Sequence, residues 1–127
     1  MTTHLHLLID VPDRSLSRGM HLLNSRYVHA FNHRHGRKGA LQLCRFGAVR
    51  IESDAHLAVG FRYVARNPVE AGATDSPLNW RWSTYAGTVG VEDGLDYVDA
   101  SRVIAMFGAG SEAVARLRGF VETASRR

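Results

Sequence analysis

Cysteine is nearly absent from the 127-residue chain, and long apolar runs are missing altogether. Cys44 is the only cysteine, so no disulfide can form within the chain, and we expect a cytoplasmic protein. The longest apolar run is far shorter than the roughly 18–20 residues that a membrane-spanning helix needs, so we expect no membrane association. The N-terminus shows no basic stretch followed by an apolar core, and the sequence therefore predicts no signal peptide.

Lysine is as scarce as cysteine. Lys38 is the only lysine, and arginine supplies the rest of the 16 basic residues in a chain of net charge +4. Because the guanidinium group binds phosphate through two parallel hydrogen bonds, this excess favours a nucleic-acid partner. Codon bias in a GC-rich genome, with solvated arginines on helix faces, explains the same composition. Both interpretations stay open at this point.

The first half of the chain predicts two strands and two helices. The length is that of one globular domain, and 45% hydrophobic residues are ordinary for such a domain. Alternating apolar residues predict strands over residues 3–10 and 41–51. Helical spacing predicts one helix from Ser15 or Ser17 to about His35, stopped by Gly36.

The second helix should begin after Ser53, a good N-cap, and should end at Asn67, because a residue before proline disfavours helical geometry. Further along, Asp99 and Ser111 should each cap a shorter helix, the last with Val114, Leu117 and Val121 facing inward. The aromatic residues Trp80, Trp82 and Tyr85 are expected to anchor the core, although such clusters also stack on bases.

Two pairs of residues are the candidates for chemistry. His4 and His6 are separated by one residue on the first predicted strand, so both imidazoles point to one face. Tyr63 and Asn67 are four apart on a predicted helix, and so lie on one face of its last turn. Each pair also occurs often by chance. The two histidines would then be polar positions on the solvated face of an edge strand, and Tyr63 would be a core residue.

Together the two pairs would make a metal-dependent phosphoryl-transfer site. Two imidazoles and an amide oxygen suit Mg²⁺ or Mn²⁺, and imidazoles also suit Zn²⁺. A tyrosine beside such a cation can attack a phosphodiester and keep the bond energy in a phosphotyrosine. That chemistry would permit strand transfer rather than simple hydrolysis.

The order of motifs resembles the single-tyrosine HUH transposases, and within them the REP-associated tyrosine transposases of the IS200-like family. The matching segments run through most of the chain: His4–Ile9, Tyr27-Val28-x-x-Phe31-Asn32, Arg45–Phe46, Ile51–Asp54, Arg62-Tyr63-Val64-x-x-Asn67-Pro68-Val69, Trp80-x-Trp82-Ser83-x-Tyr85, Phe107–Gly108 and Phe120–Val121. The segment around Tyr63 is the most specific of these.

The resemblance implies a ferredoxin-like α/β sandwich, an α+β fold whose antiparallel sheet carries the HUH strand, followed by C-terminal helices. It implies a transposase domain over residues 1–91 and a helical extension over residues 92–127. Family members carry a strand, a helix and a further strand before the HUH strand. This chain begins almost on the motif, so we expect an N-terminally truncated fold.

The resemblance also assigns roles. Tyr63 is the nucleophile, and His4, His6 and Asn67 hold the divalent metal, Mg²⁺ or Mn²⁺. The implied substrate is single-stranded DNA folded as a REP-like hairpin, cleaved and rejoined through a 5'-phosphotyrosine. Tyr27 is a rival nucleophile, but its apolar stripe predicts a core position. The expected DNA contacts are the basic side chains Arg34, Arg37, Lys38, Arg45, Arg50, Arg62 and Arg66.

Two alternatives remain. One is a DNA-hairpin-binding remnant whose catalysis is lost, and the other is a structural zinc or small metal-binding protein that uses His4, His6 and further histidines. The sequence leaves open whether the protein is a monomer or a homodimer, and which DNA hairpin it recognises.

Overall fold

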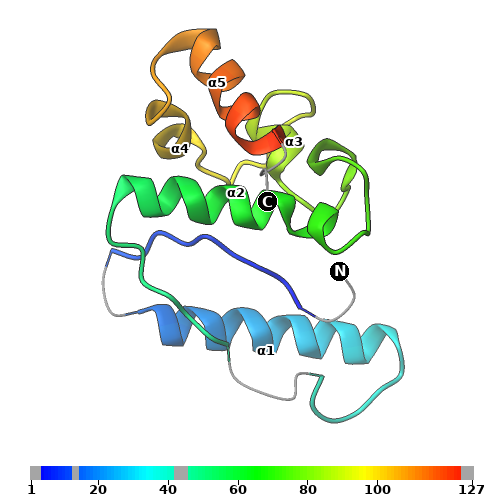
Figure 1. Ribbon diagram of the computed structural model, residues 1–127. Coiled ribbons are helices and arrows are strands. Elements are labelled where there is room, and N and C mark those ends of the chain that lie inside the picture. Colours follow the sequence, from blue (N-terminus) through cyan, green and yellow to red (C-terminus); the bar gives the residue numbers. More distant parts are fainter. Residues whose placement is uncertain (1–3, 13–14, 42–45, 124–127) are drawn as a thin grey trace. The chain divides into compact units, whose positions relative to one another are not determined.

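The computed structural model describes residues 4–12, 15–41 and 46–123, and it is built from helices (Figure 1). The elements in chain order are α1 (Leu16–Arg34), α2 (Asp54–Glu70), the 3₁₀ turn η1 (Pro77–Asn79), α3 (Tyr85–Thr88), α4 (Ser101–Ala105) and α5 (Gly110–Glu122). The chain divides into two compact units, one formed by residues 1–8 with 51–127 and the other by residues 9–50. We call these the α2–α5 unit and the α1 unit.

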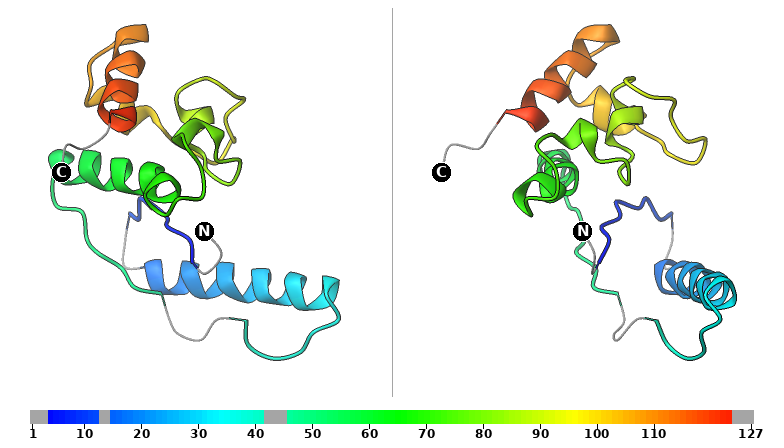
Figure 2. Two further views of the ribbon diagram at one scale, coloured as in Figure 1. Left: turned by 45° about the vertical axis from the view of Figure 1, so that its right-hand side comes forward. Right: turned by 90° about the vertical axis from the view of Figure 1, so that its right-hand side faces the viewer.

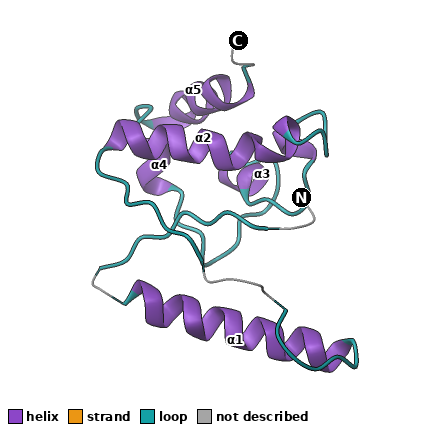
Figure 3. Cartoon of the chain, turned by 60° about the horizontal axis from the view of Figure 1, so that its bottom comes forward, coloured by secondary structure: helices purple, strands orange, loops and turns teal. Residues whose placement is uncertain are grey.

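The predicted ferredoxin-like α+β sandwich is wrong, because none of the described residues forms a strand (Figure 3). Residues 4–10 and 46–51 have no regular secondary structure, and residues 42–45 of the second predicted strand lie outside the described residues. Alternating apolar residues favour an extended backbone, but a strand also needs a neighbour for its N–H and C=O groups. Leu5 remains 65% exposed and Val49 83% exposed, so the apolar faces predicted for these strands are not covered.

The core of the α2–α5 unit lies where α5 packs against α2 (Figure 2). Ala113, Leu117 and Val121 follow one another at four-residue intervals on α5, and all three are fully buried. Ala65 of α2 and Tyr85 of α3 belong to the same cluster of buried side chains. The predicted inward positions of Leu117 and Val121 are therefore confirmed.

The ends of α2 confirm one prediction and correct another. The Ser53 hydroxyl accepts a hydrogen bond of 3.1 Å from the His56 N–H, as the N-cap prediction required. The predicted end at Asn67 is wrong, because α2 continues through Pro68 to Glu70. A proline in the last turn removes a single backbone hydrogen bond. After the helix the chain turns at Gly72, which adopts φ 68°, and the Ala73 N–H donates a hydrogen bond to Pro68 O.

The aromatic cluster is only partly in the core. Tyr85 is 2% exposed and its hydroxyl donates a hydrogen bond of 3.0 Å to Glu122 Oε1. Trp80 is half-buried, whereas Trp82 is 73% exposed with the Arg81 guanidinium over its ring. The expected core role is thus confirmed for Tyr85 and wrong for Trp82.

The α1 unit contains a single described helix with little to pack against. α1 spans nearly the predicted range, and Gly36 at φ 60° ends it as expected. Met20 is its only buried residue, while Leu23 and Tyr27 are about half exposed. The predicted core position of Tyr27 is therefore wrong, because an apolar stripe is buried only when a second layer covers it. The predicted boundary between residues 91 and 92 stays a prediction.

Candidate functional site

The structure brings His4 and His6 together with Tyr63 within the α2–α5 unit. The His6 ring packs edge-on against the Tyr63 ring, with the ring centroids 5.2 Å apart and the planes at 77°. The His4 ring packs in the same manner against His6, with centroids 4.9 Å apart. Tyr63 nonetheless remains 57% exposed, so a substrate can reach it. Three of the four predicted site residues thus form one continuous row of rings.

Residues 4–8 lie antiparallel to α2. Leu8 Cδ2 is 3.8 Å from the position that a β-carbon at Gly60 would occupy, and His6 contacts Tyr63, one helical turn further along. The observed contacts therefore join His4, His6 and Tyr63. The place of Asn67 beside them stays a prediction.

The electrostatics of His6 favour a neutral ring. Burial, and then the nearby His4, lower the pKa of His6 from its ordinary value near 6.5. Its Nε2 atom is shielded from solvent and has no hydrogen-bond partner among the described residues. A buried nitrogen without a partner is costly, and a neutral imidazole offers a lone pair to a cation. The chemistry of His6 therefore fits metal ligation.

The predicted donor set would suit a metal whose coordination shell is completed by a substrate. Within the described part of the chain, no three His, Cys, Asp or Glu side chains are grouped so that they could hold an ion. The predicted donors, two imidazoles and the Asn67 amide oxygen, would bring no negative charge. A divalent metal held by them would need water and substrate phosphates to complete its coordination shell.

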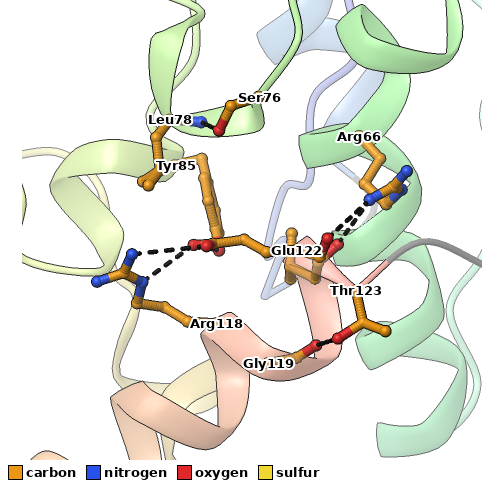
Figure 4. A network of polar contacts seen from close by, with 9 residues as sticks. Arg66, Ser76, Leu78, Tyr85, Arg118, Gly119, Glu122 and Thr123 are labelled. Carbon is orange, nitrogen blue, oxygen red and sulfur yellow. Dashed lines mark hydrogen bonds and ion pairs between the residues drawn. The ribbon is translucent and has the colours of Figure 1, made fainter.

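Two of the predicted DNA contacts have partners inside the α2–α5 unit. The Arg66 guanidinium donates hydrogen bonds to the carbonyl oxygens of Val121 and Glu122, at 3.2 and 3.4 Å (Figure 4). It also pairs with Glu70 at 3.0 Å. Arg62 donates to Thr123 O at 2.7 Å. Carbonyl groups at a helix C-terminus lack partners within the helix, and these two arginines bind them at the end of α5.

The α1 unit holds most of the remaining predicted contacts. Arg34, Arg37, Lys38 and Arg50 are all exposed there, and Arg45 lies outside the described residues. Residues 9–50 contain eight of the 16 basic residues but only two of the 12 acidic residues, so this segment carries a charge of +6. The rest of the chain carries −2. A strongly positive segment is the electrostatic signature of a nucleic-acid-binding surface.

This segregation of charge is readable from the sequence, but the prediction of a nucleic-acid partner rested on the total charge alone. No acidic residue occurs between residues 14 and 51. The segment adds Arg18 and Arg26 of α1 to the predicted basic residues. It also contains three α1 histidines, His21, His29 and His33, that no sequence-based prediction assigned to a site.

Features of the whole chain complete the description. Within residues 4–12, 15–41 and 46–123, no helix is both long enough and apolar enough to cross a bilayer. Comparison of the chain with protein-family models, with curated proteins and with solved structures gave no match.

Proposed function

We propose that this protein cleaves and rejoins single-stranded hairpin DNA, with Tyr63 as the nucleophile. The packing of the His6 ring against the Tyr63 ring, with His4 next to His6, is the observation that carries the proposal. It joins two imidazoles to a solvent-accessible phenol from a distant part of the chain. The order of motifs around these residues, similar to single-tyrosine HUH transposases, supports the same chemistry.

The reaction would run as two transfers of one phosphoryl group. The Tyr63 hydroxyl loses its proton and its oxygen bonds to the scissile phosphorus, while the 3' oxygen of the upstream strand leaves and takes up a proton. A 3' hydroxyl then attacks the 5'-phosphotyrosine, which restores the phosphodiester and releases Tyr63. His4, His6 and Asn67 would hold a divalent cation, and such a cation supplies neutralisation of charge on the phosphate oxygens.

The test is formation of a covalent adduct. Purified protein is incubated with Mn²⁺ and a hairpin oligonucleotide labelled at its 3' end, and labelled protein is detected on a denaturing gel. We expect an adduct with the wild-type chain and none with Tyr63→Phe. Tyr27→Phe is the matched control, because Tyr27 is also a helical tyrosine and is 56% exposed. An adduct that survives in Tyr63→Phe, or is lost only in Tyr27→Phe, would contradict the proposal.

A second candidate is hairpin binding without cleavage. The +6 charge of residues 9–50 favours it, and so does the lack of a sheet among the described residues. This candidate predicts steeply salt-dependent binding of the same oligonucleotide. It also predicts that the folded wild-type protein forms no adduct with Mn²⁺.

A further inference from the structure

A groove of about 690 Å³ runs along the C-terminal half of α1 within the α1 unit. The loop that follows α1 forms its second wall, and Asn32, His29, His33, Arg37, Lys38 and Leu41 are among its lining residues. The groove is open to solvent along its length, as a site for one segment of a polymer would be. None of the proposed chemistry at Tyr63 uses this groove.

The loop is fastened to the helix by hydrogen bonds. Gly36 adopts φ 60° and turns the chain back, so that the Arg37 N–H donates to Asn32 O at 2.9 Å. The Asn32 side-chain amide then donates to Gly39 O at 2.8 Å, and Gly39 itself adopts φ 93°. Both positive φ values favour glycine. One asparagine therefore ties the loop to α1 at two points and fixes the width of the groove.

The charges of the groove select an anion. Arg37 and Lys38 are the charged residues among its lining groups, and no carboxylate lies among them. Acidic residues are also absent from the sequence between residues 14 and 51. A phosphate in the groove would thus meet two cations and no repelling charge.

The groove also offers flat surfaces. His29 and His33 are four residues apart on α1, so their rings lie on one face of the helix, and both are exposed. Imidazole rings are among the side chains on which unpaired bases stack. Next to the groove, Phe31 packs on the His35 ring at a centroid distance of 4.3 Å and has the Arg37 guanidinium 5.9 Å above it, which positions Arg37.

We propose that this groove binds one nucleotide of a single-stranded nucleic acid. Arg37 and Lys38 hold the phosphate, and the base lies along the imidazoles of His29 and His33. The inference rests on the proposed function to the extent that both require single-stranded DNA, but it assigns the α1 unit its own binding site. Binding at this site needs neither Tyr63 nor a divalent metal.

The test is fluorescence anisotropy of a labelled oligo(dT) with EDTA present. We expect the double variant Arg37→Ala/Lys38→Ala to lose about tenfold or more in affinity and the slope of log K against log salt to fall by about 0.7, which is the contribution of one neutralised phosphate on a single strand. The double variant Arg18→Ala/Arg26→Ala is the control, because it removes the same charge from the same unit outside the groove lining. Equal losses in the two double variants would overturn the site.

A second pair of variants tests the base contact. We expect His33→Ala to weaken oligo(dT) binding at least fivefold and His33→Phe, which keeps a flat ring, to restore most of it. Failure of His33→Phe to bind better than His33→Ala would overturn the stacking role. Thymidine monophosphate tests whether the groove binds a free nucleotide rather than a polymer. If it displaces labelled oligo(dT) as well as unlabelled oligo(dT) does at the same concentration, the assignment to a nucleic acid is overturned.

The two proposals fail separately. If oligo(dT) binding depends on the groove but no Tyr63 adduct forms, only the cleavage proposal is lost. If the adduct forms but groove variants bind as wild type, only the groove assignment is lost.

Discussion

Arg66 and Arg37 were both predicted to contact DNA, but the structure predicts that changing each of them has a different consequence. The Arg66 side chain is 12% exposed and its guanidinium binds two carbonyl groups at the end of α5. The lining of the groove includes Arg37, which is exposed. We therefore expect Arg66→Met to lower stability and Arg37→Met to lower nucleic-acid affinity. Methionine keeps much of the apolar stem of arginine in both cases.

The magnitude follows from the contacts. Hydrogen bonds from a charged donor contribute about 1.5–3 kcal/mol each, but Val121 O and Glu122 O share one Nη1 atom and therefore count as roughly one bond. The pair with Glu70 is half exposed and lies at i, i+4, where such pairs contribute about 0.3–0.5 kcal/mol. We expect Arg66→Met to cost about 2–3 kcal/mol. The expected cost of Arg37→Met is below about 0.5 kcal/mol.

Urea unfolding followed by tryptophan fluorescence is the assay. Both tryptophans, Trp80 and Trp82, belong to the α2–α5 unit, so their signal reports the unit that Arg66 stabilises. With an m-value of about 1–3 kcal/mol/M, the midpoint for Arg66→Met should fall by about 1–2 M. An unchanged midpoint, combined with a loss of oligonucleotide affinity, would refute the capping role and return Arg66 to the DNA surface.

Two further predictions concern the core. Leu117→Ala should cost about 2–5 kcal/mol in the same urea assay, because Leu117 is fully buried. Val59→Ala, at a 62% exposed position of the same unit, should cost less than about 1 kcal/mol, and equal costs would contradict the assigned core. Burial raises the pKa of Tyr85, and so does its hydrogen bond to the Glu122 carboxylate. Tyr85 therefore ionises near pH 10 in the unfolded chain but stays neutral at that pH in the folded protein. Stability should therefore fall above pH 10 by up to about 1.4 kcal/mol per pH unit, and Tyr85→Phe should flatten that fall in urea titrations at rising pH.

Local patterns in the sequence predicted the two long helices well, but the predicted cap at Ser111 is wrong, because α5 begins at Gly110 with Ala109 as its N-cap. The apolar spacing before Gly36 and the Ser53 N-cap both correspond to observed features of α1 and α2. Such features depend on residues within one or two turns of each other, so the sequence contains the information. Pro68 was misjudged, because its energetic cost depends on whether it falls in the interior or in the last turn of a helix.

The candidate site was predicted in parts. The sequence placed His4 and His6 on one side of a segment and Tyr63 and Asn67 on one side of a helix. Only the tertiary structure placed His6 against Tyr63. It also gave Arg66 a partner in α5, which no local pattern around residue 66 predicts.

The sequence by itself determined where most helices form, which faces of them are apolar, and that residues 9–50 carry a net charge of +6. The tertiary structure decided that the segments around Leu5 and Val49 form no sheet and that the apolar face of α1 stays largely uncovered. Helix hydrogen bonds close within four residues, so a local sequence is enough to specify them. Strand pairing and side-chain burial require a partner from elsewhere in the chain, and no pattern within a segment states whether that partner is present.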